Sequence, residues 1–157
     1  MPAGAVEGIE ARVERASSHL TLVYTLRGDL GRIRIPAPSA KGFTDGLWKH
    51  TCCEAFVAGA DGYDEFNLSP SGAFAAYRFS GYRAGMLRLE GQVPVSWRPG
   101  MLEASVPLRA DARRLALSAV IEEANGALSY WALRHAAGKP DFHHADAFTH
   151  PLDEDRP

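Results

Sequence analysis

The stretch between residues 47 and 86 combines acidic side chains, among them Glu54 and Glu65, with an amide and several aromatic rings. In a strand over residues 63–68, period 2 places Tyr63, Glu65 and Asn67 on one face. The preceding strand, residues 53–58, places Glu54 on one of its faces. Carboxylates and amides bond to hydroxyl groups, and aromatic rings stack on apolar ligand faces. These residue types therefore indicate recognition of a polyhydroxylated ligand.

The predicted ligand-binding set has two kinds of member. The stacking candidates are aromatic and the hydroxyl-fixing candidates are charged or amide side chains, and together they are Trp48, Glu54, Tyr63, Glu65, Asn67, Tyr77, Arg78 and Tyr82. Whether Tyr77 or Arg78 shares the polar face depends on the register of the strand over residues 73–79. The alternative is a set of surface acids and packed aromatic residues that only support the fold.

Catalysis and metal binding are weaker hypotheses. Two facing acids, from Glu54, Glu65 and Glu122 or Glu123, are what a glycosidase needs, but spacing alone does not establish such a pair. The histidine-rich end, His135, Asp141, His143, His144 and His150, lacks the spacing of a helical ligand pair. We therefore expect neither an enzyme nor a metal site.

Cys52 and Cys53 are the only cysteines of the chain. On a strand they point to opposite faces, so a disulfide between them would distort the backbone. The sequence predicts two free thiols, with Cys53 in the core.

The elements around this stretch are predicted to be strands. Alternating apolar residues occur over 9–15, 20–27, 101–108 and 115–122, and shorter strand-like runs over 33–36, 85–90, 93–97 and 128–134. Asn125-Gly126 is a strong hairpin signal, and residues 110–113 suggest one helical turn. This pattern predicts an all-β fold, a single antiparallel β-sandwich. The predicted core is Ile9, Val13, Leu20, Leu22, Tyr24, Phe66, Leu117, Ile121, Trp131 and Leu133.

Length and composition agree with one globular domain over residues 1–157, with a frayed tail at 153–157. The chain has 157 residues, of which 46% are hydrophobic and 23% charged. A net charge of −2 argues against nucleic acid as a partner. The first residues have neither a basic start nor an apolar run, and no apolar segment is long enough to span a membrane, so we expect a cytoplasmic protein.

Several motifs resemble the bacterial DOMON-like domain family, which is related to the family 9 carbohydrate-binding modules. They are the Trp-led entry, C-E-A-F-V, E-F-N-L-S-P-S-G followed by A-Y-R-F, and, near the other end, Y-W-A-L and P-D-F-H-H with Phe148. The resemblance spans residues 20–152. It implies an antiparallel β-sandwich that binds a small ligand, usually a sugar or a haem, and has no catalytic activity.

Haem is the alternative ligand that this resemblance admits. The candidate axial residues are Met86 or Met101 with His50, His135 or His144. None of these pairs matches a haem-binding motif, so no cofactor is predicted. A third class of function is a protein-interaction module that docks a partner on a sheet edge or an aromatic face.

Overall fold

Strands dominate the computed structural model, which describes residues 4–39, 42–81, 84–132 and 150–151. The strands are β1 Val6–Arg15, β2 His19–Gly28, β3 Cys52–Ala58, β4 Tyr63–Leu68, β5 Phe74–Phe79, β6 Leu87–Arg88, β7 Val95–Arg98, β8 Met101–Pro107, β9 Arg114–Glu122, β10 Leu128–Ala132 and β11 His150–Pro151. Two 3₁₀ turns, η1 Leu30–Arg32 and η2 Leu47–Lys49, complete the elements of the described residues.

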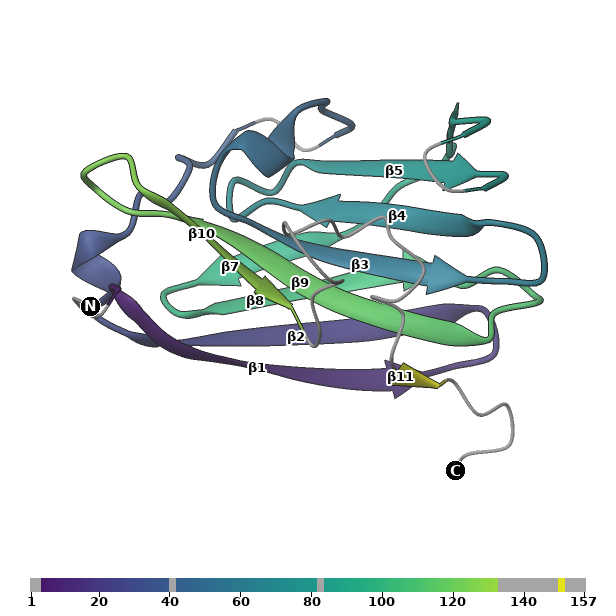
Figure 1. Cartoon of the computed structure of the whole chain (residues 1–157), viewed down its shortest axis with the longest axis horizontal. Helices are drawn as coiled ribbons and strands as arrows, with labels where there is room; N and C mark the ends of the chain where they lie inside the picture. The colour runs from purple at the N-terminus through teal and green to yellow at the C-terminus, as the bar shows by residue number, and fades with distance from the viewer. Residues whose placement is uncertain (1–3, 40–41, 82–83, 133–149, 152–157) are drawn as a thin grey trace.

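Within the described residues, the strands form two antiparallel sheets. The smaller sheet has the order β1-β2-β8-β7, and the larger has the order β10-β9-β3-β4-β5-β6, with β11 also paired to β9. Figure 1 shows β3, β4, β5 and β9 in one layer, with β7 and β8 behind them. The predicted all-β antiparallel sandwich is therefore confirmed. The strand order is new information, because β9 pairs with β3 across a long chain separation.

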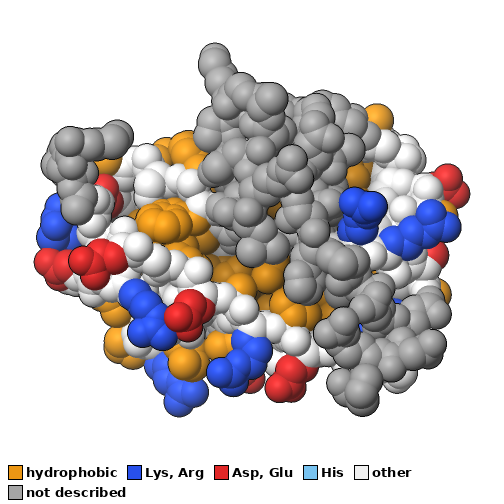
Figure 2. All heavy atoms as spheres, turned by 60° about the horizontal axis from the view of Figure 1, so that its bottom comes forward, with side chains coloured by type: hydrophobic (Ala, Val, Ile, Leu, Met, Phe, Trp, Pro, Cys, Tyr) orange, Lys and Arg blue, Asp and Glu red, His pale blue; other side chains and the backbone are white. Residues whose placement is uncertain are grey.

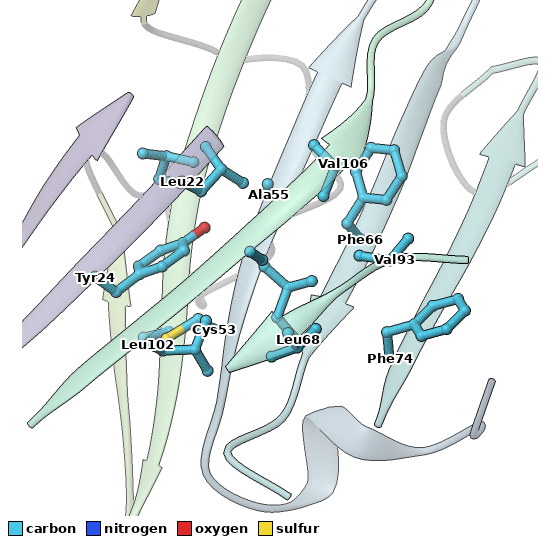
Figure 3. Packing of buried hydrophobic residues seen from close by; sticks show 14 of the residues in the cluster. Leu22, Tyr24, Cys53, Ala55, Phe66, Leu68, Phe74, Val93, Leu102 and Val106 are labelled. Carbon is cyan, nitrogen blue, oxygen red and sulfur yellow. The ribbon is translucent and has the colours of Figure 1, made fainter. Parts of the chain in front are cut away.

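The main core lies between the two sheets. Leu22, Tyr24 and Leu102 project from the smaller sheet toward Phe66 and Leu68 of the larger one (Figure 3). The Tyr24 hydroxyl donates a hydrogen bond of 2.7 Å to the backbone carbonyl of Glu54, which ties the sheets together. Of the predicted core residues, six are buried, namely Leu20, Leu22, Tyr24, Phe66, Leu117 and Ile121; Ile9, Val13 and Trp131 are partly buried against them, and Leu133 lies outside the described residues.

Turn chemistry explains where the chain reverses. Gly126 follows Asn125 between β9 and β10 with φ of 89°, and the Asn125 side chain accepts a 2.9 Å hydrogen bond from the Ala127 amide. The predicted Asn-Gly hairpin is thus confirmed. Residues 110–113 form no helix, contrary to the prediction. The Asp111 carboxylate instead accepts hydrogen bonds from the Arg109 guanidinium and the Ala60 amide, at 2.6 and 3.0 Å, and such bonds favour a turn.

The surface carries charges of both signs. Figure 2 shows Lys and Arg side chains interspersed with Asp and Glu around the margin of one face, with hydrophobic side chains between them. Among the described side chains of this face, no continuous basic row of the kind that follows a phosphate backbone is visible. In the part of the chain that the structure describes, no helix has the length and apolar character needed to cross a membrane.

Candidate functional site

The outer face of the larger sheet, opposite the main core, carries a polar set that is buried. Strand register brings it together: Glu54 of β3 lies between Asn67 of β4 and Ser118 of β9, and Glu65 of β4 lies opposite Tyr77 of β5. All five residues are buried. Sequence alternation predicted the shared face of Glu65 and Asn67, and the pairing of β3 with β4 adds Glu54 to it.

Glu54 is 2% exposed and has two described side-chain partners. The Ser118 hydroxyl donates to its Oε1 at 2.9 Å, and the Cys52 thiol lies 3.9 Å from its Oε2. Burial, reinforced by the charge of Glu65, raises the pKa of Glu54 to about 8, although the Ser118 and Cys52 contacts lower it. At neutral pH, Glu54 is therefore mainly a neutral carboxylic acid.

Asn67 is the most unusual member of the polar set. Its exposed fraction is 0%, and among the described residues neither Oδ1 nor Nδ2 has a hydrogen-bond partner. An asparagine amide can donate two hydrogen bonds and accept two. Leaving a buried polar group unpaired costs about 1–3 kcal/mol, so a buried amide without partners requires an explanation.

Aromatic rings flank the polar set toward the β3–β4 turn. Tyr63 and Phe79 stack with ring centroids 4.8 Å apart and an interplanar angle of 16°. Phe56 and Tyr77 also belong to this buried cluster. The face therefore combines flat apolar rings with hydrogen-bonding groups, as sites for sugars do.

The segment 42–51 closes over one side of the aromatic cluster. Phe43 and Leu47 pack against the cluster, and the Phe43 ring centroid is 5.5 Å from that of Tyr77. The Tyr77 hydroxyl donates a hydrogen bond to Asp45. Burial, together with the hydrogen bond and charge of Asp45, raises the pKa of Tyr77. The far end of the segment is fixed to β9, because His50 Nδ1 lies 3.0 Å from Glu122 Oε1.

Trp48, a predicted stacking residue, does not join the aromatic cluster. It lies on η2 with 52% of its surface exposed, and the Lys49 ammonium is 5.6 Å from its ring centroid. The neighbouring Leu47 packs on the cluster in its place. A helical turn directs adjacent side chains differently, and the short turn η2 was not predicted from the sequence.

Arg78 lies apart from the polar set, because the register places Tyr77 opposite Glu65 and thus directs Arg78 to the other face. Its guanidinium forms a bidentate ion pair with the buried Asp64, at 2.7 and 2.9 Å. Arg109 approaches the same carboxylate at 3.5 Å. Arg78 therefore pairs with Asp64 on the opposite face of β5, and its predicted position beside Glu65 is corrected, because Tyr77 occupies that position. Tyr82 lies outside the described residues.

The haem and metal hypotheses find no geometric support in the described part of the chain. Met101 is on the smaller sheet, where its sulfur accepts from Arg98 at 3.5 Å, whereas His50 contacts the larger sheet. Met86 is exposed. His135, Asp141, His143 and His144 are outside the described residues, and among those described no group of three or more His, Cys, Asp or Glu side chains can hold a metal ion.

The two cysteines are free and buried. Cys53 packs in the main core, and Cys52 lies on the outer face beside Glu54. Burial raises the pKa of both thiols, so neither is an activated nucleophile.

Sequence reasoning missed two members of the site, Ser118 and Asp45. Ser118 is the single hydroxyl in the apolar run of β9, and this interruption was a usable signal. Its place beside Glu54 depends on the β3–β9 register, which links residues 64 positions apart. Asp45 lies in a loop, where alternation gives no information.

Comparisons with known proteins support the fold. No protein-family model matches the chain, and no curated protein matches it. The structure is similar to a crystal structure, at 2.70 Å resolution, of a "putative carbohydrate-binding protein" from Bacteroides uniformis ATCC 8492. The TM-score is 0.58 at 16% sequence identity, over 89% of this chain and 75% of that one.

Proposed function

We propose that this chain is a non-catalytic binding protein for a small polar ligand, a saccharide or a sugar-containing metabolite, held on the outer face of the larger sheet. The observation that carries the proposal is the buried amide of Asn67, which has no hydrogen-bond partner in the part of the chain that the structure describes and lies beside Glu54. Adjacent sugar hydroxyls both donate and accept, so one vicinal diol satisfies Oδ1 and Nδ2 together.

The aromatic cluster gives the proposal its second element. The apolar face of a sugar ring stacks on tyrosine or phenylalanine, and Tyr63 and Tyr77 are positioned in the same cluster as Phe79. Glu65, opposite Tyr77, places a second carboxyl group at the boundary between rings and polar groups. The ligand thus meets both kinds of contact on one sheet face.

The arrangement of the two carboxyl groups supports the proposal of binding without turnover. Glu54 and Glu65 project from the same face of adjacent strands, as diagonal neighbours in the β3–β4 register. Glycosidases place two carboxyl groups on either side of the scissile bond. Two acids on one wall approach a sugar from one side, which suits hydrogen bonding.

The fold comparison and the sequence motifs support the same class of function. The Bacteroides uniformis protein is named for carbohydrate binding, and its fold is shared by this chain. Membership of the DOMON-like family is part of the proposal and rests on the motifs around Glu54, Glu65 and Asn67. A cytoplasmic location is also proposed, and the two free thiols are compatible with a reducing compartment.

Access of a ligand to the aromatic cluster requires motion, because the cluster is buried. We assign this motion to the segment 42–51, whose Phe43 and Leu47 cover the aromatic cluster. Gly46, the N-cap residue of η2, has φ of 77°, a backbone conformation that glycine adopts readily. Breaking the Tyr77–Asp45 hydrogen bond releases the middle of this segment.

A thermal-shift screen tests the proposed function. The purified chain is heated with monosaccharides, oligosaccharides, nucleotide sugars and haemin, and a hit is confirmed by calorimetry. We expect a saccharide to raise the midpoint and Asn67→Leu to abolish the shift, because the hydrogen bonds to the amide are lost. The matched control is Gln92→Leu, which removes an exposed amide and keeps the shift.

Two outcomes contradict the proposal. If no saccharide raises the midpoint, or if Asn67→Leu keeps the full shift, the outer face is not the sugar site. A rise of the midpoint with haemin, together with a low-spin absorption band, would favour the haem alternative. If none of the tested small molecules changes the midpoint, the protein-interaction module is favoured.

A further inference from the structure

The charge state of the polar set narrows the class of ligand, on the premise that the proposed function is right. Glu54 makes its described side-chain contacts with neutral groups, the Ser118 hydroxyl and the Cys52 thiol. Within the described residues, none of its hydrogen bonds or ion pairs involves a cation. Asn67, its cross-strand neighbour, is also uncharged.

We propose that Glu54, Asn67 and Ser118 form an uncharged polar subsite that selects a neutral, hydroxyl-rich ligand over its carboxylated or phosphorylated counterpart. In this subsite, Glu54 acts as a carboxylic acid that donates one hydrogen bond and accepts others. Asn67 donates from Nδ2 and accepts at Oδ1, so the pair addresses two neighbouring hydroxyls. Ser118 fixes the Glu54 carboxyl group through the 2.9 Å bond to Oε1.

The groups around Glu54 favour its neutral form. The titratable groups that the packed elements present toward this face are Cys52 from β3, Tyr63 and Glu65 from β4, Tyr77 from β5, Glu122 from β9, and Asp45 and His50 from the segment 42–51. Three of these are acids, and the one histidine is already paired with Glu122. Two arginines share the face at its margins: Arg88 of β6 lies opposite Tyr77, and Arg114 of β9 lies opposite Ala58, four residues from Glu54. Burial and the Glu65 charge are the main causes that raise the pKa of Glu54 to about 8.

The same groups disfavour an anionic ligand. A carboxylate or phosphate on the sugar would lose its hydration on burial, which is costly for a charged group. The described neighbours of Glu54 offer hydroxyl, thiol and amide groups, which compensate an anion poorly. A neutral hydroxyl that is hydrogen-bonded by Asn67 and Glu54 loses much less on burial, so the selection comes from the desolvation cost of the anion.

The first test compares matched sugars by calorimetry. Glucose, glucuronate and glucose 6-phosphate form one set, and galactose, galacturonate and galactose 6-phosphate form another. In whichever series binds, we expect the neutral sugar to have at least tenfold higher affinity at pH 7 than the carboxylated or the phosphorylated sugar. Glu54→Gln, which keeps a neutral donor and acceptor, should stay within about threefold of the unaltered protein, and Asn67→Asp should lose at least tenfold.

The pH dependence gives a further readout. The unaltered protein should lose affinity for the neutral sugar as pH rises through about 8, since ionised Glu54 no longer donates. Glu54→Gln should show no such loss. An anionic sugar that binds as tightly as the neutral one, or a tenfold loss in Glu54→Gln at pH 7, overturns the inference.

Infrared spectroscopy separates this inference from the proposed function, because it needs no ligand. At pH 7, the protein should show the carbonyl band of a protonated carboxylic acid, and Glu54→Gln should remove it. If the band is present and no sugar binds, the uncharged subsite is supported and the saccharide function fails. If the variant leaves the spectrum unchanged, Glu54 is ionised and the inference fails, whatever the sugars do.

Discussion

Replacing Asn67 with leucine should stabilise the ligand-free protein while removing its binding function. The two side chains have the same heavy-atom branching, so leucine fills the site at 0% exposure without a new cavity. Both amide atoms are without partners, and each unpaired buried group costs about 1–3 kcal/mol. Part of this gain is offset by imperfect packing of the new methyl groups.

The expected result is a rise of about 1–3 kcal/mol in the free energy of unfolding. Such a change moves the midpoint of a domain of this size upward by several degrees. Urea denaturation of the ligand-free protein measures this change, provided that the dependence of the unfolding free energy on urea concentration is the same for the variant and the unaltered protein. The exposed control Gln92→Leu should change stability by no more than about 0.5 kcal/mol.

The opposite sign would refute this reasoning. A loss of 1 kcal/mol or more in Asn67→Leu, with the control unchanged, would mean that the amide makes hydrogen bonds in the ligand-free protein. Asn67 would then be part of the scaffold. Its contribution to stability would then explain why it is buried, and no ligand would be needed to explain the buried amide.

The remaining predictions concern charge and backbone. The pKa of Glu54 is about 8 in the folded chain against an ordinary 4.5, so the folded state binds this proton more tightly than the unfolded state. The protonated Glu54 therefore stabilises the fold fully below about pH 4.5. This stabilisation falls by up to about 5 kcal/mol as the pH rises to about 8. Glu54→Gln should remove this pH dependence from the free energy of unfolding, measured by denaturation between pH 4.5 and 8. The same pH dependence in the variant and the unaltered protein would contradict the prediction. Gly62→Ala should lower the free energy of unfolding by about 2 kcal/mol or more, because φ is +83° and the new Cβ would lie 1.9 Å from the Phe79 carbonyl oxygen. The control Gly91→Ala, at φ of +106° with open space around the new Cβ, should lower it less. Equal thermal midpoints for the two variants would be inconsistent with the Phe79 contact. Asp64→Ala should cost about 3 kcal/mol by chemical denaturation, because the buried carboxylate pairs with two arginines, and a loss below 1 kcal/mol would show that the network contributes little.

The fold was predictable because alternation along a strand is a local property. The apolar positions of β2, from Leu20 to Tyr24, and the Asn125-Gly126 turn needed no information from distant residues. The same alternation correctly placed Glu65 and Asn67 on one face. These features follow from backbone geometry alone.

The rest of the site depends on contacts between distant segments. Whether Tyr77 or Arg78 faces Glu65 is decided by a single residue of register, and a slip of one residue exchanges the two faces. The pairing of Ser118 with Glu54 requires β9 to lie beside β3, which no local pattern specifies. Burial of the polar face was also unexpected, because acids on an outer sheet face are usually solvated.

The side-chain amide of Asn67 tests the central claim most directly. The chain contains two asparagines and one glutamine, so nitrogen–proton spectra hold three side-chain amide pairs, from Asn67, Gln92 and Asn125. Titration with the saccharide that raises the thermal midpoint should shift the Asn67 pair and slow its exchange with water, while the exposed Gln92 and Asn125 pairs stay fixed. Unchanged Asn67 signals at saturating sugar would contradict the proposed site.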